Sequence, residues 1–347
     1  MSLIKKFLGS KQYKEQKSED VGKKIRILAV DGGGLKGMFT VYAIWRLKEE
    51  YGINLVEEFD MFTGTSTGAI VVGSLLIGKD PKEIYDEYMR GEKDLFGKKY
   101  TLRESMSKNI YARYDDEPLN RTLKETLGNL TIADFEKVSP KPFAIAATNV
   151  SEAKPIIFGS SHFHSLNPRY SSSIKLWEAI KASTAAPFYF EPHVEQETGA
   201  FWLDGGMWAN NPALLGVVLA QGDLGIELKN ITVLSFGQSF IEGVSVHPRK
   251  GRELLKNPSQ NTVGLLAYAS LYANQNFDTF AVSLLLKERH FRYSPREQNE
   301  HAKIDSIDDE YLKYCQKNWE VNKEKLVKFI QTGKNSNYNL GDTKRYN

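Results

Sequence analysis

The sequence predicts an α/β protein with a central, mostly parallel sheet flanked by helices, followed by a helical C-terminal region. Short runs of β-branched and aliphatic residues alternate with helical patterns from residue 23 to residue 237. The strand candidates are apolar almost throughout, which is typical of strands buried on both faces of a sheet. Two of the strand-to-helix junctions consist of glycine-rich turns. Strands that alternate with helices in this way favour a parallel sheet.

Composition and charge exclude several classes of protein. The chain has 347 residues, of which 41% are hydrophobic and 26% charged, as in ordinary globular proteins. A net charge of +3 is compatible with an anionic membrane surface but gives no reason to expect a DNA partner. Cys315 is the only cysteine, so an intramolecular disulfide and a cysteine metal cluster are both excluded. This cysteine usage is typical of a reducing cytosol.

Residues 1–22 are expected to form a flexible basic arm. Leu3, Ile4, Phe7 and Leu8 would share one helical face, with several lysines close by, so the arm could rest on anionic lipid. For so short a segment, a frayed and solvated terminus is the favoured interpretation. No stretch has the eighteen or so apolar residues of a membrane span, and the arm lacks the apolar core of a signal peptide.

The elements are expected in a regular order. The first strand, residues 23–30, leads through a glycine run into a helix over 38–50, and the second, 59–63, leads into a helix over 67–77. The further elements expected before residue 240 are a helix from Asp80-Pro81 to Gly91, an insertion over 92–116, a helix over 118–127, a strand over 142–149 with 155–158 as its partner, a helix over 175–183, a strand over 201–204, a helix over 212–220 and a core strand over 231–237.

The chain is expected to divide into the arm at 1–22, a catalytic domain at 23–240 and a helical region at 241–347 packed on the same domain. Long helical patterns cover residues 262–286 and 309–330. This last region shows no motif that indicates chemistry.

The first candidate site residue is Ser66, in the pattern G-T-S-T-G of residues 64–68. A serine between a strand end and a helix start, with Gly64 and Gly68 around it, matches a nucleophile elbow. The backbone N–H of Thr67 at the helix N-terminus could then help to hold an oxyanion. The alternative is a Gly/Ser loop that caps a helix, because short G-x-S-x-G matches arise readily by chance.

The second candidate is the glycine run D-G-G-G-L-K-G of residues 31–37. Its glycines formally spell G-x-G-x-x-G, the dinucleotide-binding fingerprint, which would make the protein a Rossmann-type oxidoreductase. Against this, Asp31 would lie beside the pyrophosphate, and no clear ribose-binding acid follows. Successive glycine N–H groups at a helix N-terminus also suit an oxyanion hole. A simple tight turn is the third interpretation.

The third candidate is Asp204, in L-D-G-G at the end of the strand expected over 201–204. The carboxyl edge of a parallel sheet is where α/β proteins keep their sites, although an Asp-Gly turn is an equal alternative. No histidine stands in a recognisable catalytic motif, so none is assigned. A carboxylate can instead accept the serine proton as the oxygen attacks, which makes a Ser-Asp dyad workable.

Taken together and in their order, these motifs resemble those of the patatin-like phospholipases. The segment A-S-T-A-A-P at 182–187, the aromatic residues at 188–190 and N-N-P at 210–212 also resemble family segments. The resemblance covers roughly residues 25–237.

The resemblance implies a three-layer patatin-like fold and hydrolysis of membrane lipid acyl esters without a metal or cofactor. It assigns Ser66 as nucleophile, Asp204 as its partner, and the N–H groups of Gly33, Gly34 and Thr67 as the oxyanion hole. The residues expected to support these motifs are Asp31, Gly32, Lys36, Gly37, Gly64, Gly68, Gly205 and Gly206. Two positions depart from the pattern: Lys36, where the family often has arginine with its bidentate fork, and Gly206, where many members have alanine.

Within the family, the compact chain with an added helical region resembles bacterial effectors that cyclic oligonucleotides switch on in antiphage defence. This implies a cyclic oligonucleotide activator, a homo-oligomer, and a cytoplasmic protein that is peripheral at the inner membrane when active. Arg103, Arg113 and Tyr114 are candidate ligand contacts, although solvated loop charges are the favoured interpretation. The alternatives are the oxidoreductase and an ungated general esterase.

Overall fold

The computed structural model describes residues 22–101, 104, 112–238, 261–295, 304–336 and 338. A mixed eight-stranded sheet has the order β5-β6-β3-β2-β1-β7-β8, and β4 pairs with the other edge of β3. Parallel pairing joins the neighbouring strands in the series β3, β2, β1, β7 and β8. Antiparallel pairing joins β4 and β6 to β3, and β5 to β6. The predicted mostly parallel sheet is therefore confirmed.

In chain order the elements are β1 (Ile25–Val30), η2 (Gly34–Gly37), α1 (Met38–Tyr51), α2 (Leu55–Glu58), β2 (Met61–Thr65), α3 (Thr67–Leu76), α4 (Pro81–Asp94), α6 (Glu117–Leu127), α7 (Ile132–Val138), β3 (Phe143–Asn149), β4 (Lys154–Gly159), η3 (Pro168–Ser171), α8 (Leu176–Ser183), β5 (His193–Val194), β6 (Phe201–Asp204), α9 (Gly206–Ala209), α10 (Ala213–Gly222), η4 (Leu228–Asn230), β7 (Ile231–Phe236), α12 (Asn261–Leu286), η5 (Lys287–Arg289), β8 (His290–Tyr293) and α13 (Asp309–Thr332). The predicted strands and helices are present, with small shifts at their ends.

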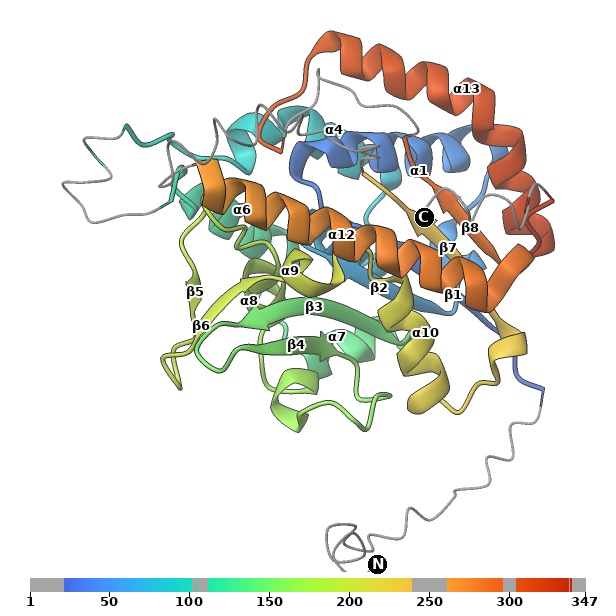
Figure 1. Ribbon diagram of the computed structural model, residues 1–347, viewed down its shortest axis with the longest axis horizontal. Helices are drawn as coiled ribbons and strands as arrows, with labels where there is room; N and C mark the ends of the chain where they lie inside the picture. Colours follow the sequence, from blue (N-terminus) through green and yellow to red (C-terminus); the bar gives the residue numbers. More distant parts are fainter. Residues whose placement is uncertain are drawn as a thin grey trace, which may run out of the picture.

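The sheet separates two hydrophobic cores, which makes the fold three-layered. Alternate residues of β1 belong to different cores: Leu28 and Val30 face α1, α3, α4, α6, α8 and α13, whereas Ile27 and Ala29 face α10 and the end of α12. Figure 1 shows α12 running along one side of the sheet beside α9 and α10, and α1 and α13 lying together elsewhere on the molecule. Because helices cover both faces, β1 is apolar on both faces, as its sequence indicated.

Two predictions about the middle of the chain need correction. Helix α4 does not end at Gly91 but continues to Asp94. Gly91 is instead a packing position, because a Cβ there would lie 2.7 Å from Leu35 Cδ2. Helix α7 was not predicted; it is short and begins where the Thr131 side chain accepts the N–H of Asp134.

The region after residue 240 was expected to be helical, but it also contains a strand. Both long helices are present as α12 and α13, but β8 adds a parallel strand next to β7. Its four residues, H-F-R-Y, are too few and too polar for periodicity to reveal a strand. The region thus extends the catalytic sheet, and the division at residue 240 stays a proposal.

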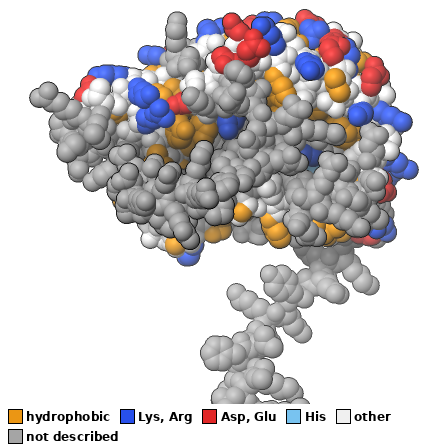
Figure 2. Space-filling view, turned by 45° about the horizontal axis from the view of Figure 1, so that its top comes forward, with side chains coloured by type: hydrophobic (Ala, Val, Ile, Leu, Met, Phe, Trp, Pro, Cys, Tyr) orange, Lys and Arg blue, Asp and Glu red, His pale blue; other side chains and the backbone are white. Residues whose placement is uncertain are grey.

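The visible surface carries charges of both signs. Figure 2 shows Lys or Arg side chains interspersed with Asp or Glu side chains along the upper edge of the displayed face. Among the described residues, no helix combines the length and apolar character needed to traverse a bilayer.

Candidate active site

Ser66 lies at a strained turn between β2 and α3. Its backbone has φ 54° and ψ −130°, a conformation that residues other than glycine rarely adopt. Holding a residue in such a region costs about 1–3 kcal/mol and is found where the surrounding structure enforces it, often at functional sites. The strand–turn–helix geometry predicted around Ser66 is present, and it is that of a nucleophile elbow.

Glycines allow α3 to begin against the end of β1. A Cβ on Gly68 would lie 2.2 Å from the backbone oxygen of Val30, and one on Gly64 would lie 2.7 Å from Ala69 Cα. Only glycine fits two such close backbone approaches. The elbow is therefore held directly against the strand that leads into the glycine run.

Asp204 reaches Ser66 from the opposite direction. Strands β2 and β6 lie end to end along one edge of β3, where Thr65 pairs with Ala146 and Asp204 pairs with Ala147. Because β2 is parallel to β3 and β6 is antiparallel, the C-terminal ends of β2 and β6 meet. The expectation that Asp204 ends a parallel strand was thus wrong, although it does lie at a strand end beside Ser66.

The two side chains lie next to each other. The Asp204 carboxylate accepts the Gly206 N–H at 2.7 Å, and the Ser66 side chain is near enough for hydrogen bonding to lower the pKa of Asp204. Burial outweighs both effects and raises the pKa of Asp204 to about 7. A buried carboxylate with a raised pKa beside a serine hydroxyl suits a general base. Gly205 is needed here, because its Cβ would lie 2.1 Å from the Ala146 oxygen.

The glycine run lies against the nucleophile. A Cβ on Gly32 would lie 2.8 Å from Ser66 Cβ, so this glycine allows the turn to touch the elbow. Gly34 has φ 63°, and its N–H donates to the Thr67 hydroxyl at 3.0 Å. The Gly33 N–H has no acceptor among the described residues, and Thr67, as the first residue of α3, has no intrahelical acceptor for its N–H. These N–H groups lie in the part of the site where the oxyanion hole is predicted.

The A-S-T-A-A-P segment fixes both members of the pair. The Ser183 hydroxyl accepts the backbone N–H of Ser66 at 2.8 Å and donates to the Ala146 oxygen at 2.6 Å. The backbone oxygen of Ala185 accepts the N–H of Asp204 at 3.0 Å. Sequence reasoning recognised this segment but gave it no role, which the structure now supplies.

Replacing Ser183 with alanine is expected to slow ester hydrolysis by about tenfold while the protein stays folded. The change leaves the Ser66 N–H and the Ala146 oxygen without their partner, which costs about 1–3 kcal/mol and loosens the elbow. Ser160→Ala is the matched control, because Ser160 is also buried and its hydroxyl also accepts a backbone N–H, that of Phe143 in β3 at 3.2 Å. The melting temperature and kcat for a soluble ester would be measured; equal kcat losses in both variants would contradict the role of Ser183.

Asp31, expected only to support the motif, is a fully buried ion pair partner. Its carboxylate accepts two hydrogen bonds from Arg292, one of them 2.7 Å from Nη1 to Oδ1, and a third from Gln275 Nε2 at 3.0 Å. Both partners lie in the region that was expected to carry no chemistry. The sequence signal was indirect: a buried aspartate needs a cation, but nothing singled out Arg292 among 46 lysines and arginines.

Two further residues cover the glycine run. Gln238 occupies the space beside Gly33, where a Cβ would lie 2.8 Å from the Gln238 Cβ. The backbone oxygen of Ile304 accepts the N–H of Leu35 at 2.8 Å and occupies the space that a Gly34 side chain would need. The run is therefore covered by Gln238, just after β7, and by Ile304 of the C-terminal region.

The remaining polar residues singled out in the sequence lie near the residues that cover the glycine run. The backbone oxygen of Lys36 accepts the Tyr311 hydroxyl at 2.9 Å. Arg113 and Tyr114 both contact the Asp305 carboxylate, at 3.1 and 2.7 Å, so the insertion is tied to the segment that covers the glycine run. The N-terminal arm, Arg103, His247 and His301 lie outside the described residues.

Among the described residues, no histidine hydrogen-bonds to Ser66 or Asp204. His290 is buried in β8 between the hydroxyls of Ser235 at 2.9 Å and Ser283 at 3.0 Å. Burial lowers its pKa to about 3, so it stays neutral at physiological pH. Its place is structural.

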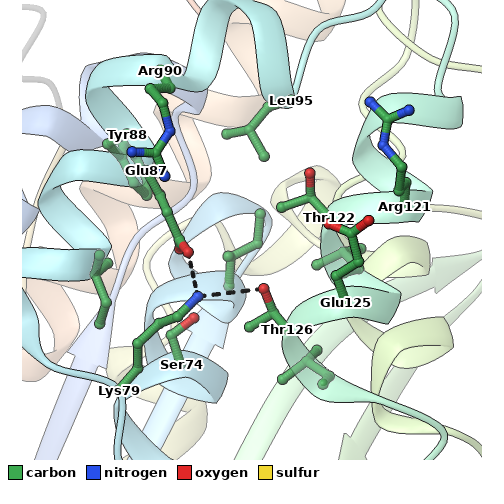
Figure 3. Close-up of a pocket in the computed structure, with 14 residues that line it drawn as sticks. Ser74, Lys79, Glu87, Tyr88, Arg90, Leu95, Arg121, Thr122, Glu125 and Thr126 are labelled. Carbon is green, nitrogen blue, oxygen red and sulfur yellow. Dashed lines mark hydrogen bonds and ion pairs between the residues drawn. The ribbon is translucent and has the colours of Figure 1, made fainter.

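A cavity of about 520 Å³ lies beside the elbow, between α3, α4 and α6. Figure 3 shows Lys79 reaching across it to Glu87 on α4 and to Thr126 on α6. In the wall, the Tyr88 hydroxyl donates to the backbone oxygen of Thr67 at 3.1 Å. Neither member of the dyad lines this cavity, but Tyr88 connects its wall to the start of α3.

A strained serine between strand and helix, a buried carboxylate beside it and a glycine run against it make up the arrangement that serine hydrolases use. The model of the family described as patatin-like phospholipase matches residues 28–216, more than half of the chain. The chain therefore belongs to the patatin-like phospholipases, and the resemblance of its motifs is confirmed. This membership favours an acyl hydrolase over the dinucleotide-dependent oxidoreductase.

Several relatives carry informative names. A cGAMP-activated phospholipase of Escherichia coli is 29% identical over 227 residues, which are 62% of this chain and 62% of the relative. A cGAMP-activated phospholipase of Vibrio cholerae is 32% identical over 57% of this chain and 58% of the relative. A cUMP-AMP-activated phospholipase of Escherichia coli is 28% identical over 65% of this chain and 67% of the relative. The alignments with the two cGAMP-activated relatives thus span about three fifths of their length.

Among solved structures, VipD from Legionella pneumophila is similar over 90% of this chain and 68% of its own, with 13% identity and a TM-score of 0.44. Membership of the patatin-like family is shown by the sequence match over residues 28–216.

Proposed function

We propose that this protein is a serine acyl hydrolase that cleaves the acyl esters of membrane phospholipids through Ser66 and Asp204. The observation that carries the proposal is that the strained turn at Ser66, the buried Asp204 carboxylate and the glycine run come together where the C-terminal ends of β2 and β6 meet. Family membership and the phospholipase names of the relatives support the lipid ester as substrate.

In the first half of the reaction, the Ser66 oxygen attacks the ester carbonyl carbon while its proton passes to the Asp204 carboxylate. The carbonyl oxygen becomes an oxyanion, which the N–H groups of Gly33, Gly34 and Thr67 would stabilise. The Gly34 N–H must first leave the Thr67 hydroxyl that accepts it. Collapse of the intermediate breaks the bond to the alcohol oxygen, which takes the proton from Asp204 and departs.

In the second half, water attacks the acyl group on Ser66 and gives its proton to Asp204. The same N–H groups stabilise the second oxyanion. When this intermediate collapses, the Ser66 oxygen takes the proton back and the free fatty acid leaves. The cycle needs ionised Asp204 at the start of each half and consumes only water.

A fluorophosphonate probe read by intact mass tests this proposal. We expect one adduct on the wild-type protein, loss of it in Ser66→Ala, and retention in Ser74→Ala, a second buried serine of the same helix. Release of fatty acid from phospholipid vesicles should follow the same pattern. Labelling that persists in Ser66→Ala would refute Ser66 as the nucleophile.

We also propose that a cyclic oligonucleotide activates the protein in antiphage defence. The names of the cGAMP- and cUMP-AMP-activated relatives support this. Vesicle hydrolysis would be measured with cGAMP, with cUMP-AMP and without nucleotide. Full activity without any nucleotide would favour an ungated esterase, and saturable NAD binding would favour the oxidoreductase.

The active protein is further proposed to be a homo-oligomer and to act on the cytoplasmic side of the inner membrane. Light scattering with and without nucleotide tests the first, and cosedimentation with anionic vesicles tests the second. A variant that lacks residues 1–11 tests whether the basic arm contributes to membrane binding. Unchanged cosedimentation would show that it does not.

A further inference from the structure

Asp31 is fixed through each of its polar groups, and each partner comes from β7 or from the chain beyond it. Its N–H donates to the backbone oxygen of Phe236 at 3.0 Å, and its backbone oxygen accepts the Gln238 side chain. Its carboxylate accepts Arg292 and Gln275. The residue that begins the glycine run is thus held by the C-terminal half of the chain.

The Arg292 guanidinium makes two of the hydrogen bonds that hold the Asp31 carboxylate. It lies on β8 opposite Ser235 of β7, which in turn pairs with Ala29 of β1, so its guanidinium spans one strand to reach Asp31. The Arg292 side chain is 13% exposed and that of Asp31 is 0% exposed. Two parallel N–H···O bonds fix the direction as well as the distance of the carboxylate.

Stability alone is a weak reason for such a pair. The desolvation of two buried charges offsets most of their attraction, and apolar replacements are often as stable. What a bidentate pair does supply is orientation. The place where orientation matters is the adjacent run, because Gly33 and Gly34 are only two and three residues after Asp31 and their N–H groups must meet a developing oxyanion.

The requirement at an oxyanion hole is strict. Donors must be held within about 0.5 Å of the productive geometry, and one poorly placed donor costs about 10²–10³ in kcat. A shift of Asp31 would be passed on to Gly33 through Gly32 alone, the single residue between them. The Arg292–Asp31 pair therefore affects the rate of ester hydrolysis through the position of the glycine run.

We propose that Arg292 is a positioning residue: by holding the Asp31 carboxylate, it keeps the N–H groups of Gly33 and Gly34 where the oxyanion forms. The inference rests on the proposed acyl hydrolase function. It makes the C-terminal region a part of the active site and not only a cover for the sheet.

The test compares Arg292→Gln, Arg292→Lys and Asp31→Asn with the wild-type protein. For Arg292→Gln we expect kcat for a soluble short-chain ester to fall by about 10–100-fold with KM within twofold, because the oxyanion exists only in the transition state. The rate of phosphonylation by the fluorophosphonate should fall by a similar factor, since the phosphonyl oxygen uses the same donors. Arg292→Lys keeps the positive charge but cannot make the bidentate contact. Its kcat and phosphonylation rate should therefore lie between those of the wild type and Arg292→Gln.

Arg289→Gln is the matched control. Arg289 precedes β8, is partly buried and donates to the backbone oxygens of Leu228 and Ile231, at the opposite end of β7. It should lower the melting temperature as Arg292→Gln does but leave kcat within twofold of wild type. Asp31→Asn combined with Arg292→Gln should be no slower than the slower single variant, because the two side chains act as one unit.

Folded Arg292→Gln with wild-type kcat and phosphonylation rate would overturn the inference, as would equal kcat losses in Arg289→Gln. If Arg292→Gln does not fold, Arg292→Lys decides: a wild-type phosphonylation rate in that variant would overturn it. A wild-type protein that is never labelled at Ser66, even with cyclic nucleotides, would instead refute the proposed function. The two failures are therefore distinguishable.

Discussion

Asp204→Asn is expected to remove ester hydrolysis and, at pH 8, to make the protein more stable. The amide cannot take the Ser66 proton, and loss of a general base lowers kcat by about 10²–10⁴-fold. The amide oxygen can still accept the Gly206 N–H, so the turn around position 204 keeps its shape. Activity loss without loss of structure would mark the carboxylate as part of the chemistry.

The gain in stability follows from the direction of the pKa shift. Burial raises the pKa of Asp204 from 3.8 in a model peptide to about 7. The folded protein therefore binds more protons than the unfolded chain between these values, and the contribution of Asp204 to stability falls as pH rises through this window. Above pH 7 the folded state carries a buried carboxylate, a cost on the order of 4 kcal/mol at most.

Melting temperatures of wild type and Asp204→Asn at pH 5 and pH 8 test this. The variant should melt at a higher temperature at both pH values, and the difference should be clearly larger at pH 8 than at pH 5, because pH 5 lies near the start of the window. Asp278 also titrates near 7 because of burial, but it is present in both proteins and cancels in the comparison. In the wild type, kcat/KM should rise with pH and level off above about 7, since only ionised Asp204 is a base. A flat profile between pH 5 and 8 would contradict Asp204 as the base.

The candidate site residues could be singled out in the sequence because each stands in a short motif at a strand end. Ser66, Asp204 and the glycine run needed no knowledge of distant contacts to be singled out. What the sequence did not reveal is how Asp204 approaches, because the meeting of β2 and β6 depends on one strand running antiparallel along β3. Strand direction is a tertiary property that local patterns do not encode.

The contribution of the C-terminal region was missed for a similar reason. The anchor Arg292 lies on a four-residue strand, and its partner Asp31 is 261 residues away in the chain. Gln275 lies on a long helix whose pattern indicated only a core. Pairings over such separations depend on topology, so a periodicity argument recognised the helices and overlooked their polar contacts.

A second large effect is expected for a glycine in the first turn of α3. Replacing Gly68 with alanine should lower kcat/KM by more than 100-fold. Its Cβ would lie 2.2 Å from the Val30 oxygen and 2.5 Å from that of Asp31, and both are backbone atoms that no rotamer change can move. Relief requires the start of α3 to move away from β1, which separates Ser66 from the glycine run. A misplacement of about 1 Å costs roughly 10²-fold in rate, and overpacking of this kind costs about 1–3 kcal/mol in stability.

Gly73→Ala in the same buried helix is the matched control. Its Cβ would lie 2.9 Å from Ile180 Cδ1, the far end of a flexible side chain, so a small rotation can accommodate it. Alanine is favoured over glycine within a helix by about 1 kcal/mol, which offsets that adjustment. We therefore expect near-normal activity and melting temperature for Gly73→Ala, measured beside Gly68→Ala with the soluble ester. Comparable activity in the two variants would mean that the contact of α3 with the end of β1 does not set the geometry of Ser66, whereas a loss confined to Gly68→Ala would trace catalysis to that contact.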